Sequence, residues 1–218
     1  MKGDKLRANI LGIRLISNLS PELIKGLSID EKYKCIGIIT ADSDDVLYTA
    51  LDEATKASDV DVVYGRSMYA GAGNASTKLA GEVVGILGGT SPAEVRSGIV
   101  AVEQYFKDGD CFVSANSDDS INYYAHTVSR TGTYLSGIAN VSEGEPLAYL
   151  VAPPLEALYG IDAALKAADV KLASMFAPPS ETNYGGALLT GSQSACFAAC
   201  AAFAQAVENI AEVNKHYE

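Results

Sequence analysis

A ten-residue stretch occurs twice in this chain of 218 residues. Residues 51–60 read LDEATKASDV and residues 161–170 read IDAALKAADV, with six identities and no gap. A fixed internal offset indicates one structural unit used twice, and a chain of this length has room for two small domains. We therefore predict two domains of one design, residues 1–108 and residues 109–218.

The composition fits a globular protein and argues against several classes of partner. Hydrophobic residues make up 48% of the chain and charged residues 20%, which is enough for packed cores. The net charge of −11 argues against nucleic acid, because no basic stripe exists to displace phosphate counterions. It argues equally against an anionic membrane surface and favours a cationic small molecule.

The sequence shows no pattern typical of a membrane span or of a signal peptide. No apolar run approaches the roughly 20 residues that a membrane span needs, and the N-terminal residues lack the apolar core of a signal peptide. The four cysteines form no CxxC pair. We therefore expect a cytosolic protein with reduced thiols.

Apolar periodicity and capping patterns predict the same order of elements in each half, which is an α/β (α+β) unit. Strands are predicted at residues 6–17, 34–41, 59–64, 81–89, 125–130, 147–153, 170–176 and 187–191, with a further extended segment from Cys111. Helices are predicted to begin at Ser20, Ser43, Ser91, Pro153 and Ser192.

Two long irregular stretches occupy the same place in each half. They are GRSMYAGAGNAST at residues 65–77 and APPSETNYGG at residues 177–186. Residues 65–77 exceed the length that a compact domain normally uses for a connection. The strand and helix that follow align at an offset of 101, as GILGGTSPAEV (85–95) with GALLTGSQSAC (186–196).

Side chains that could carry catalysis are sparse. The histidines are His126 and His216, and His126 with the nearby Ser129 lacks the GxSxG elbow of a serine nucleophile. Cys196 and Cys200 lie at i and i+4 and could share a metal, but they alternate with Ala and Phe, which is typical of core residues.

Two further patterns leave alternatives open. Residues 71–74, GAGN, superficially resemble a phosphate-binding loop but lack its spacing and its lysine, which favours a flexible loop. Asp44, Asp45 and Glu82 adjoin elements of one domain and could bind an ammonium group. The other interpretation of these three carboxylates is helix capping and a solvated surface.

The repeat resembles the A-x-x-x-K-A-x-x-V signature of bacterial microcompartment shell domains. The tandem arrangement is similar to the tandem-domain shell proteins of ethanolamine-utilisation microcompartments. The stretches that carry this resemblance are ADSDDV (41–46), VVYGRSMYAGA (62–72), HTVSRTGTYLSG (126–137), YLVAPPLEALYGIDAALKAADV (149–170) and PPSETNYGGALLTGSQ (178–193).

The resemblance implies a homotrimer in which each chain supplies two circularly permuted shell domains. The trimer is a pseudo-hexameric tile that packs laterally against other shell proteins around the enzymes that degrade ethanolamine. No catalytic residue, metal or cofactor is implied. Lys56 and Lys166 match the lysine at the tile edge.

The resemblance also implies two kinds of pore. Ethanolamine would lie in small acidic pores, at positions that match Asp44, Asp45, Glu82, Phe112 and Thr182. The gate of a central pore would be formed by Gly65, Arg66, Ser67, Met68, Tyr69, Gly71, Gly73 and Asn74 in the first copy and by Pro178, Pro179, Ser180, Glu181, Asn183, Tyr184 and Gly185 in the second.

Two other functions stay open at the level of sequence. One is an enzyme of amine metabolism with its active site between the halves. The other is a soluble sensor module whose loops close over a small amine and which does not assemble into sheets.

Overall fold

The computed structural model describes residues 1–68, 77, 81–178, 180 and 182–212. The chain divides into two compact units. The first-copy unit comprises residues 8–110 and 132–135, and the second-copy unit comprises residues 1–7, 111–131 and 136–218. Residues 1–7 and 132–135 each pack in the unit of the other half of the chain.

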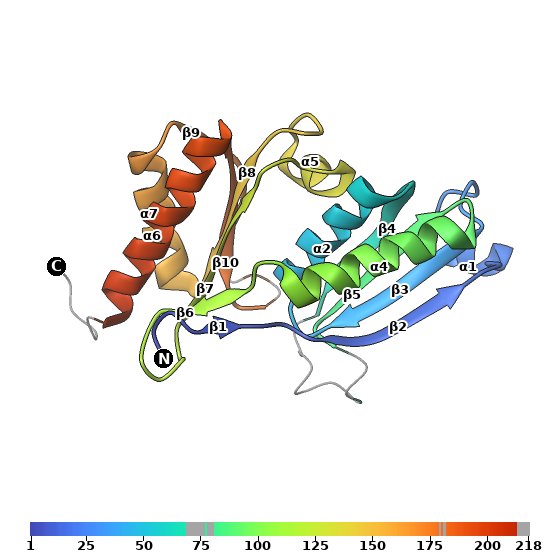
Figure 1. Ribbon diagram of the computed structural model, residues 1–218, viewed down its shortest axis with the longest axis horizontal. Coiled ribbons are helices and arrows are strands. Elements are labelled where there is room, and N and C mark those ends of the chain that lie inside the picture. Colours follow the sequence, from blue (N-terminus) through green and yellow to red (C-terminus); the bar gives the residue numbers. More distant parts are fainter. Residues whose placement is uncertain (69–76, 78–80, 179, 181, 213–218) are drawn as a thin grey trace. The chain divides into compact units, whose positions relative to one another are not determined.

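The first-copy unit contains a four-stranded antiparallel sheet covered by two helices (Figure 1). The helices pack against each other, and their buried residues join those of β3 and β5 in one core that includes Ile39, Leu47, Leu51 and Leu87. Its elements are β2 (Ile10–Ile16), α1 (Pro21–Gly26), β3 (Cys35–Ala41), α2 (Asp44–Ala57), β4 (Val60–Ser67), β5 (Val83–Gly89) and α4 (Pro92–Asp108). The strand order is β2-β3-β5-β4.

The second-copy unit contains a six-stranded sheet in the order β1-β6-β7-β8-β10-β9. Its elements are β1 (Lys5–Leu6), β6 (Phe112–Ser114), β7 (Asn122–Val128), α5 (Thr133–Ala139), β8 (Leu147–Ala152), α6 (Pro154–Ala167), β9 (Val170–Phe176), β10 (Gly185–Gly191) and α7 (Gln193–Glu212). The N-terminus joins this unit because β1 pairs with β6. The core lies between the sheet and the packed pair α6 and α7, around Leu150, Ile161 and Phe203 (Figure 1).

The two units share one design, as the repeat predicts. The order β7-β8-β10-β9 matches β2-β3-β5-β4 strand for strand. Ile10, Pro21 and Cys35 begin β2, α1 and β3, and the matching β7, α5 and β8 each begin 112 residues later. The helices α2 and α6 begin 110 residues apart. Gly89 pairs with the first residue of β3 and Thr190 with the first residue of β8, which confirms the offset of 101 between β5 and β10.

Capping residues place most helix starts where the sequence predicts them. Ser20 caps α1 with Pro21 at the first helical position, and Ser91 forms a capping box with Glu94. The Ser192 hydroxyl accepts the Ala195 N–H at 3.1 Å at the start of α7. Each of these side chains satisfies a backbone donor that the helix itself leaves free.

Several element bounds differ from the prediction. The single strand expected at residues 6–17 is two strands, β1 and β2, because β1 pairs with β6 while β2 pairs with β3. The helix α5 was not predicted: it begins directly after Gly132, which has no side chain to cap it, and it contains a second glycine, Gly137. Strand β4 continues to Ser67, and β10 begins at Gly185, so the first irregular stretch begins later and the second ends earlier than expected.

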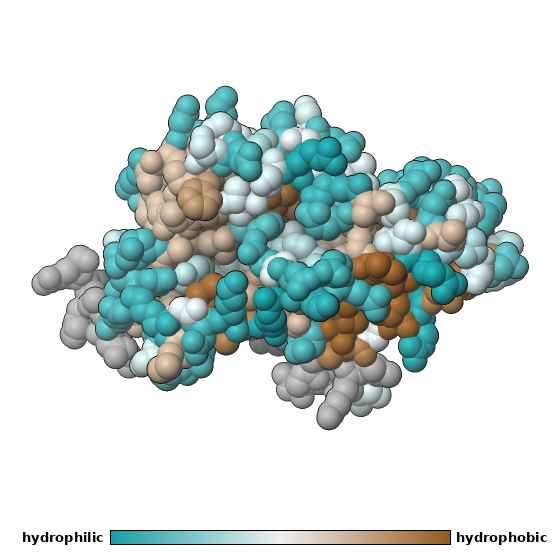
Figure 2. All heavy atoms as spheres, in the orientation of Figure 1, coloured by the Kyte–Doolittle hydropathy of each residue, from teal (hydrophilic) through white to brown (hydrophobic). Residues whose placement is uncertain are grey.

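The helix α7 is long and apolar enough to cross a membrane by length and composition alone, in contrast to the expectation from sequence. Its buried side, which includes Cys196, Cys200 and Phe203, belongs to the core of the second-copy unit. The outer side carries Phe197 and alanines, and Figure 2 shows this apolar surface over α7. The burial confirms Cys196 and Cys200 as core residues and gives α7 the pattern of a core helix.

Candidate functional site

An acidic group lies at one end of the first-copy sheet. Asp42 follows β3, Asp44 begins α2, and Glu82 directly precedes β5. Burial raises the pKa of Glu82, and the negative charges of Asp44 and Asp42 raise this pKa further. The structure thus brings Asp44 and Glu82 together as the sequence suggests, and it adds Asp42, which sequence reasoning missed.

Backbone pairing holds Glu82 in this position. Its N–H donates to Ala41 O at 2.8 Å, and its carbonyl accepts the Met68 N–H at 2.6 Å. The preceding Gly81 has φ +71°, and a Cβ atom there would lie 2.7 Å from Ala41 O. Only glycine fits such a position, which is why the chain can turn into β5 with Glu82 beside the start of α2.

Hydroxyl groups connect the acidic group to α2 and β4. The Ser67 hydroxyl donates to Asp44 Oδ2 at 2.7 Å and lies 2.6 Å from the Tyr48 hydroxyl. Asp45 belongs to the first turn of α2: its N–H donates to Asp44 Oδ1 at 2.9 Å, and its carbonyl accepts the Thr49 hydroxyl at 2.9 Å. The acidic group therefore has one carboxylate, that of Asp44, with hydroxyl groups in reach, an arrangement suited to a small cation bearing hydrogen-bond donors.

Phe112 and Thr182, the other two predicted pore residues, belong to the second-copy unit. The Phe112 ring lies 5.4 Å from the Tyr124 ring and 6.0 Å from the Tyr184 ring, between centroids. Thr182 lies in a turn in which its N–H donates to the Ser180 hydroxyl at 3.4 Å. The five predicted residues are therefore divided between the units, three in the first copy and two in the second.

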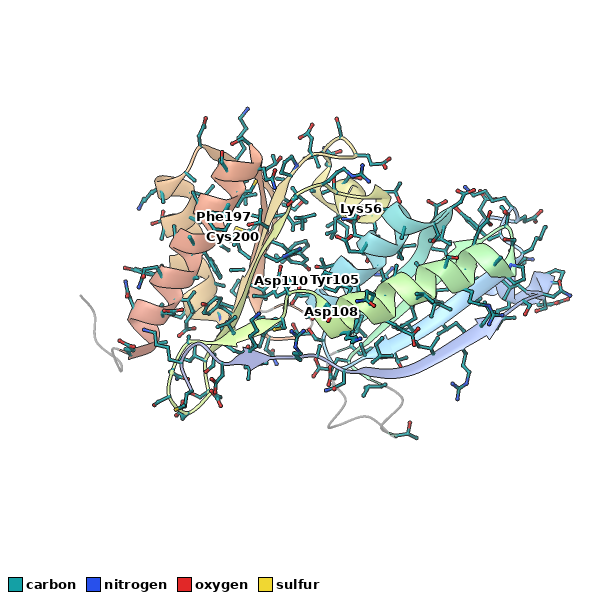
Figure 3. The ribbon with its side chains drawn as sticks, viewed as in Figure 1. Lys56, Tyr105, Asp108, Asp110, Phe197 and Cys200 are labelled. Atoms are coloured by element: carbon teal, nitrogen blue, oxygen red, sulfur yellow. The ribbon has the colours of Figure 1, made fainter. Side chains whose placement is uncertain are left out.

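The two predicted edge lysines have different surroundings. Lys56, at the end of α2 (Figure 3), is 12% exposed and lies 3.5 Å from the fully buried Asp52. Lys166 is 74% exposed and pairs with the exposed Asp162 at 2.6 Å. The two lysines occupy equivalent positions in the sequence repeat, but the structure gives them different exposure.

Residues 132–135 pack against α2 beside Asp52 in the first copy. Asp52 accepts the N–H groups of Gly132 and Leu135, each at 2.8 Å. Gly132 has no side chain that could cap α5, so the Asp52 carboxylate supplies the cap. A Cβ atom at Gly132 would collide with Thr55 Oγ1 and lie 2.7 Å from Asp52 O. This close approach of backbone to α2 requires glycine.

Among the described residues, no group of three or more His, Cys, Asp and Glu side chains could hold a metal ion. His126 lies in β7 with its ring 5.8 Å from that of Tyr124. His216 lies outside the described residues.

Comparison with known proteins decides the family. The BMC domain family matches residues 35–117. The bacterial microcompartment shell protein EutL of Clostridium perfringens is 67% identical, over 97% of each chain. The chain belongs to the EutL family of bacterial microcompartment shell proteins. This confirms the resemblance found in the sequence and assigns a structural role in a microcompartment shell.

Further EutL proteins agree along the whole chain. The EutL shell protein of Escherichia coli is 52% identical over 95% of each chain. The crystal structure of the ethanolamine utilization protein EutL from Leptotrichia buccalis superposes with a TM-score of 0.97, at 60% identity, and covers all of both chains. The EutL fold of two shell domains is therefore shown for this chain.

The BMC match has bounds that differ from those of the compact units. It begins at β3, after β2 and α1, and extends beyond the end of the first-copy unit into β6. The match therefore follows neither the bounds of the first-copy unit nor those of the second-copy unit.

The predicted gate residues fall in three places. Gly65, Arg66 and Ser67 lie in β4, and Gly185 lies in β10. Met68, Pro178, Ser180, Asn183 and Tyr184 lie in the connections, where Asn183 has φ +65° and the Tyr184 hydroxyl donates to Asn122 Oδ1 at 3.0 Å. Tyr69, Gly71, Gly73, Asn74, Pro179 and Glu181 lie outside the described residues.

Proposed function

We propose that this chain forms a homotrimeric, pseudo-hexameric tile in the shell of an ethanolamine-utilisation microcompartment. The tile packs laterally against other shell proteins. Small acidic pores pass ethanolamine, and the two irregular stretches gate a central pore. The tile carries out no catalysis and holds no cofactor.

The acidic group at Glu82 is the observation that carries the ethanolamine assignment. Protonated ethanolamine has an ammonium group and a hydroxyl. Three carboxylates that repel one another gain from a nearby cation, because the cation offsets both their mutual repulsion and the cost of burial. The Ser67 and Tyr48 hydroxyls offer hydrogen-bond partners next to Asp44. These features are what a cation-selective pore lining requires.

Isothermal titration of ethanolamine tests this assignment. We expect the wild-type chain to bind ethanolamine and Glu82→Gln and Asp45→Asn to weaken binding at least tenfold, separately. Glu103→Gln, on the exposed side of α4, removes the same charge elsewhere and controls for net charge. Equal affinity in all four proteins would overturn the pore assignment.

The internal repeat supports the trimer. Three chains of two shell domains give six domains in a ring, which is the closed arrangement that a head-to-tail contact of like units produces. Sedimentation velocity of the purified chain in dilute buffer measures its mass. A trimer agrees with the tile, whereas a stable monomer or dimer removes the three-fold axis and favours the sensor module.

A further inference from the structure

A short series of hydrogen bonds connects two hydroxyl side chains to the acidic group. The Ser67 hydroxyl donates to Asp44 Oδ2 at 2.7 Å, and the Tyr48 hydroxyl lies 2.6 Å from the Ser67 hydroxyl. Tyr48 follows Asp44 by one turn of α2, and α2 packs against β4, which ends at Ser67 (Figure 1). The three side chains therefore come from two packed elements of the first-copy unit.

The number of hydrogens on these groups fixes the direction of the series. A hydroxyl carries one hydrogen, and an ionised carboxylate carries none. Because the Ser67 hydrogen goes to Asp44, Tyr48 must be the donor in its bond with Ser67. A hydroxyl that accepts a hydrogen bond becomes a stronger donor, so the bond from Tyr48 strengthens the bond from Ser67 to Asp44.

This direction leaves only acceptors unused among the three side chains. Both hydroxyl hydrogens are taken, and Asp44 Oδ1 accepts the Asp45 N–H at 2.9 Å. A ligand that forms hydrogen bonds with these groups must therefore supply the hydrogens itself. A protonated primary amine has three N–H donors. A quaternary ammonium ion has the same charge and no N–H donor.

Packing holds the Tyr48 ring in its position. The Tyr134 ring lies edge-on to it, with 5.9 Å between the centroids. A Cβ atom at Gly65 would lie 3.5 Å from Tyr48 Cε1 and would collide with the Tyr134 hydroxyl, so glycine keeps β4 close to both rings. Burial raises the pKa of Tyr134, and the negative charge of Asp44 raises it further. The Tyr48 hydroxyl is thus placed by α2, β4 and residues 132–135 together.

The second copy of the repeat lacks both ends of this series. The helices α2 and α6 begin 110 residues apart. At the positions of Asp44 and Tyr48, α6 has Pro154 and Leu158. The carboxylate and the phenol thus occur together in one copy and are replaced together in the other, as expected if Tyr48 acts through Asp44.

We propose that Tyr48 and Ser67 are positioning residues of the ethanolamine site. Through Ser67, Tyr48 holds the Asp44 carboxylate in the orientation that accepts an N–H of the ammonium group. The two hydroxyls thereby make the site selective for amines with N–H donors over quaternary ammonium ions of equal charge. This inference rests on the proposed ethanolamine site and adds the residues that set its selectivity.

Isothermal titration with ethanolamine and with choline distinguishes hydrogen bonding from charge, because choline carries methyl groups in place of the N–H hydrogens. We expect the wild-type chain to prefer ethanolamine by at least about tenfold. Tyr48→Phe and Ser67→Ala should each weaken ethanolamine binding by about five- to tenfold, the effect of one lost hydrogen bond to a charged group. Choline affinity should change by less than about twofold, so the preference falls. A general loss of structure would weaken both ligands.

Two further variants complete the experiment. Ser67→Thr restores a hydroxyl at a strand position, where β-branched residues fit well, and should recover most of the affinity lost in Ser67→Ala. Tyr33→Phe removes another phenol of the first-copy unit, whose hydroxyl donates to Asp61, and should bind ethanolamine as the wild type does. Far-ultraviolet circular dichroism confirms that each variant is folded.

The outcomes distinguish this inference from the proposed site. If Glu82→Gln weakens ethanolamine binding while Tyr48→Phe and Ser67→Ala leave it unchanged, the site stands and the positioning role is wrong. Equal losses of ethanolamine and choline affinity would also overturn the positioning role. A wild-type chain that binds no ethanolamine would instead overturn the proposed site, and the inference with it.

Discussion

Asp52 and Lys56 lie one turn apart on α2 and pair at 3.5 Å, with 0% and 12% of their side chains exposed. Their repeat counterparts, Asp162 and Lys166, pair at 2.6 Å with 62% and 74% exposed. The same residue types at the same spacing thus form a buried anchor in one copy and a solvated pair in the other.

We expect Asp52→Ala to destabilise the folded chain by about 2–4 kcal/mol, because two buried N–H groups and Lys56 lose their acceptor. Urea unfolding at fixed protein concentration measures this loss. Glu53→Ala, on the same helix and 38% exposed at its side chain, is the control and changes stability by less than about 0.5 kcal/mol. Equal effects of the two substitutions would contradict the anchor role of Asp52.

The two lysines should differ in lateral assembly. We expect Lys166→Ala to reduce the formation of tile sheets, seen by electron microscopy, while the trimer mass stays unchanged, because Lys166 is 74% exposed and matches the lysine at the tile edge. Lys56→Ala should lower the unfolding midpoint and affect sheets less, because its ammonium group faces Asp52 and Glu53. A loss of sheets with Lys56→Ala alone would reverse this assignment.

Glu82 gives the chain a defined pH dependence. Its pKa is raised above the ordinary value by burial, Asp44 and Asp42, so the folded state binds more protons than the unfolded state between the two pKa values. Stability therefore falls as pH rises through that window and stays lower above it. An ammonium ligand favours the ionised carboxylate, so ethanolamine affinity should rise over the same range.

Glu82→Gln should remove both effects. Thermal melts and ethanolamine titrations start at about pH 4, near the ordinary carboxylate pKa, and extend to about pH 8. If Glu82→Gln keeps the wild-type dependence of stability and ethanolamine affinity on pH, a group other than Glu82 causes that dependence.

Two helical glycines should respond in opposite directions to alanine. A Cβ atom at Gly160, in α6, would lie 2.7 Å from the Phe203 ring, so Gly160→Ala should cost about 1–3 kcal/mol through overpacking. Gly137, in α5, has no atom within 4 Å of such a Cβ. Gly137→Ala should stabilise by about 0.5–1 kcal/mol. Denaturant midpoints distinguish the two, and a stabilising Gly160→Ala would contradict the close packing of α6 on α7.

Local sequence patterns predicted most of the fold. Strands β3 and β9 and the starts of α1, α4 and α7 follow from apolar runs and from serine caps, which act over a few residues. The helix α5 was missed because its cap is Asp52, 80 residues earlier in the chain. The extension of β4 to Ser67 was missed because pairing with β5, not the composition of GRS, keeps that segment extended.

The candidate site was predictable only in part. Asp44 and Glu82 stood out as carboxylates next to predicted elements. Asp42 did not, because its contribution to the pKa of Glu82 arises from the alignment of β3 with β5. The gate residues, the small-pore set and the edge lysines were matched through family resemblance, and they remain predictions for the experiments above.

The sequence by itself determined the duplication, the order of helices and strands in each copy, and the EutL family, because repeats, periodicity and family motifs are properties of the chain order. Only the tertiary structure decided that the copies are used differently. Residues 1–7 pair in the second-copy sheet, and residues 132–135 bury Asp52 while Asp162 stays in water. Burial depends on which distant segment covers a side chain, and two similar local patterns do not specify that segment.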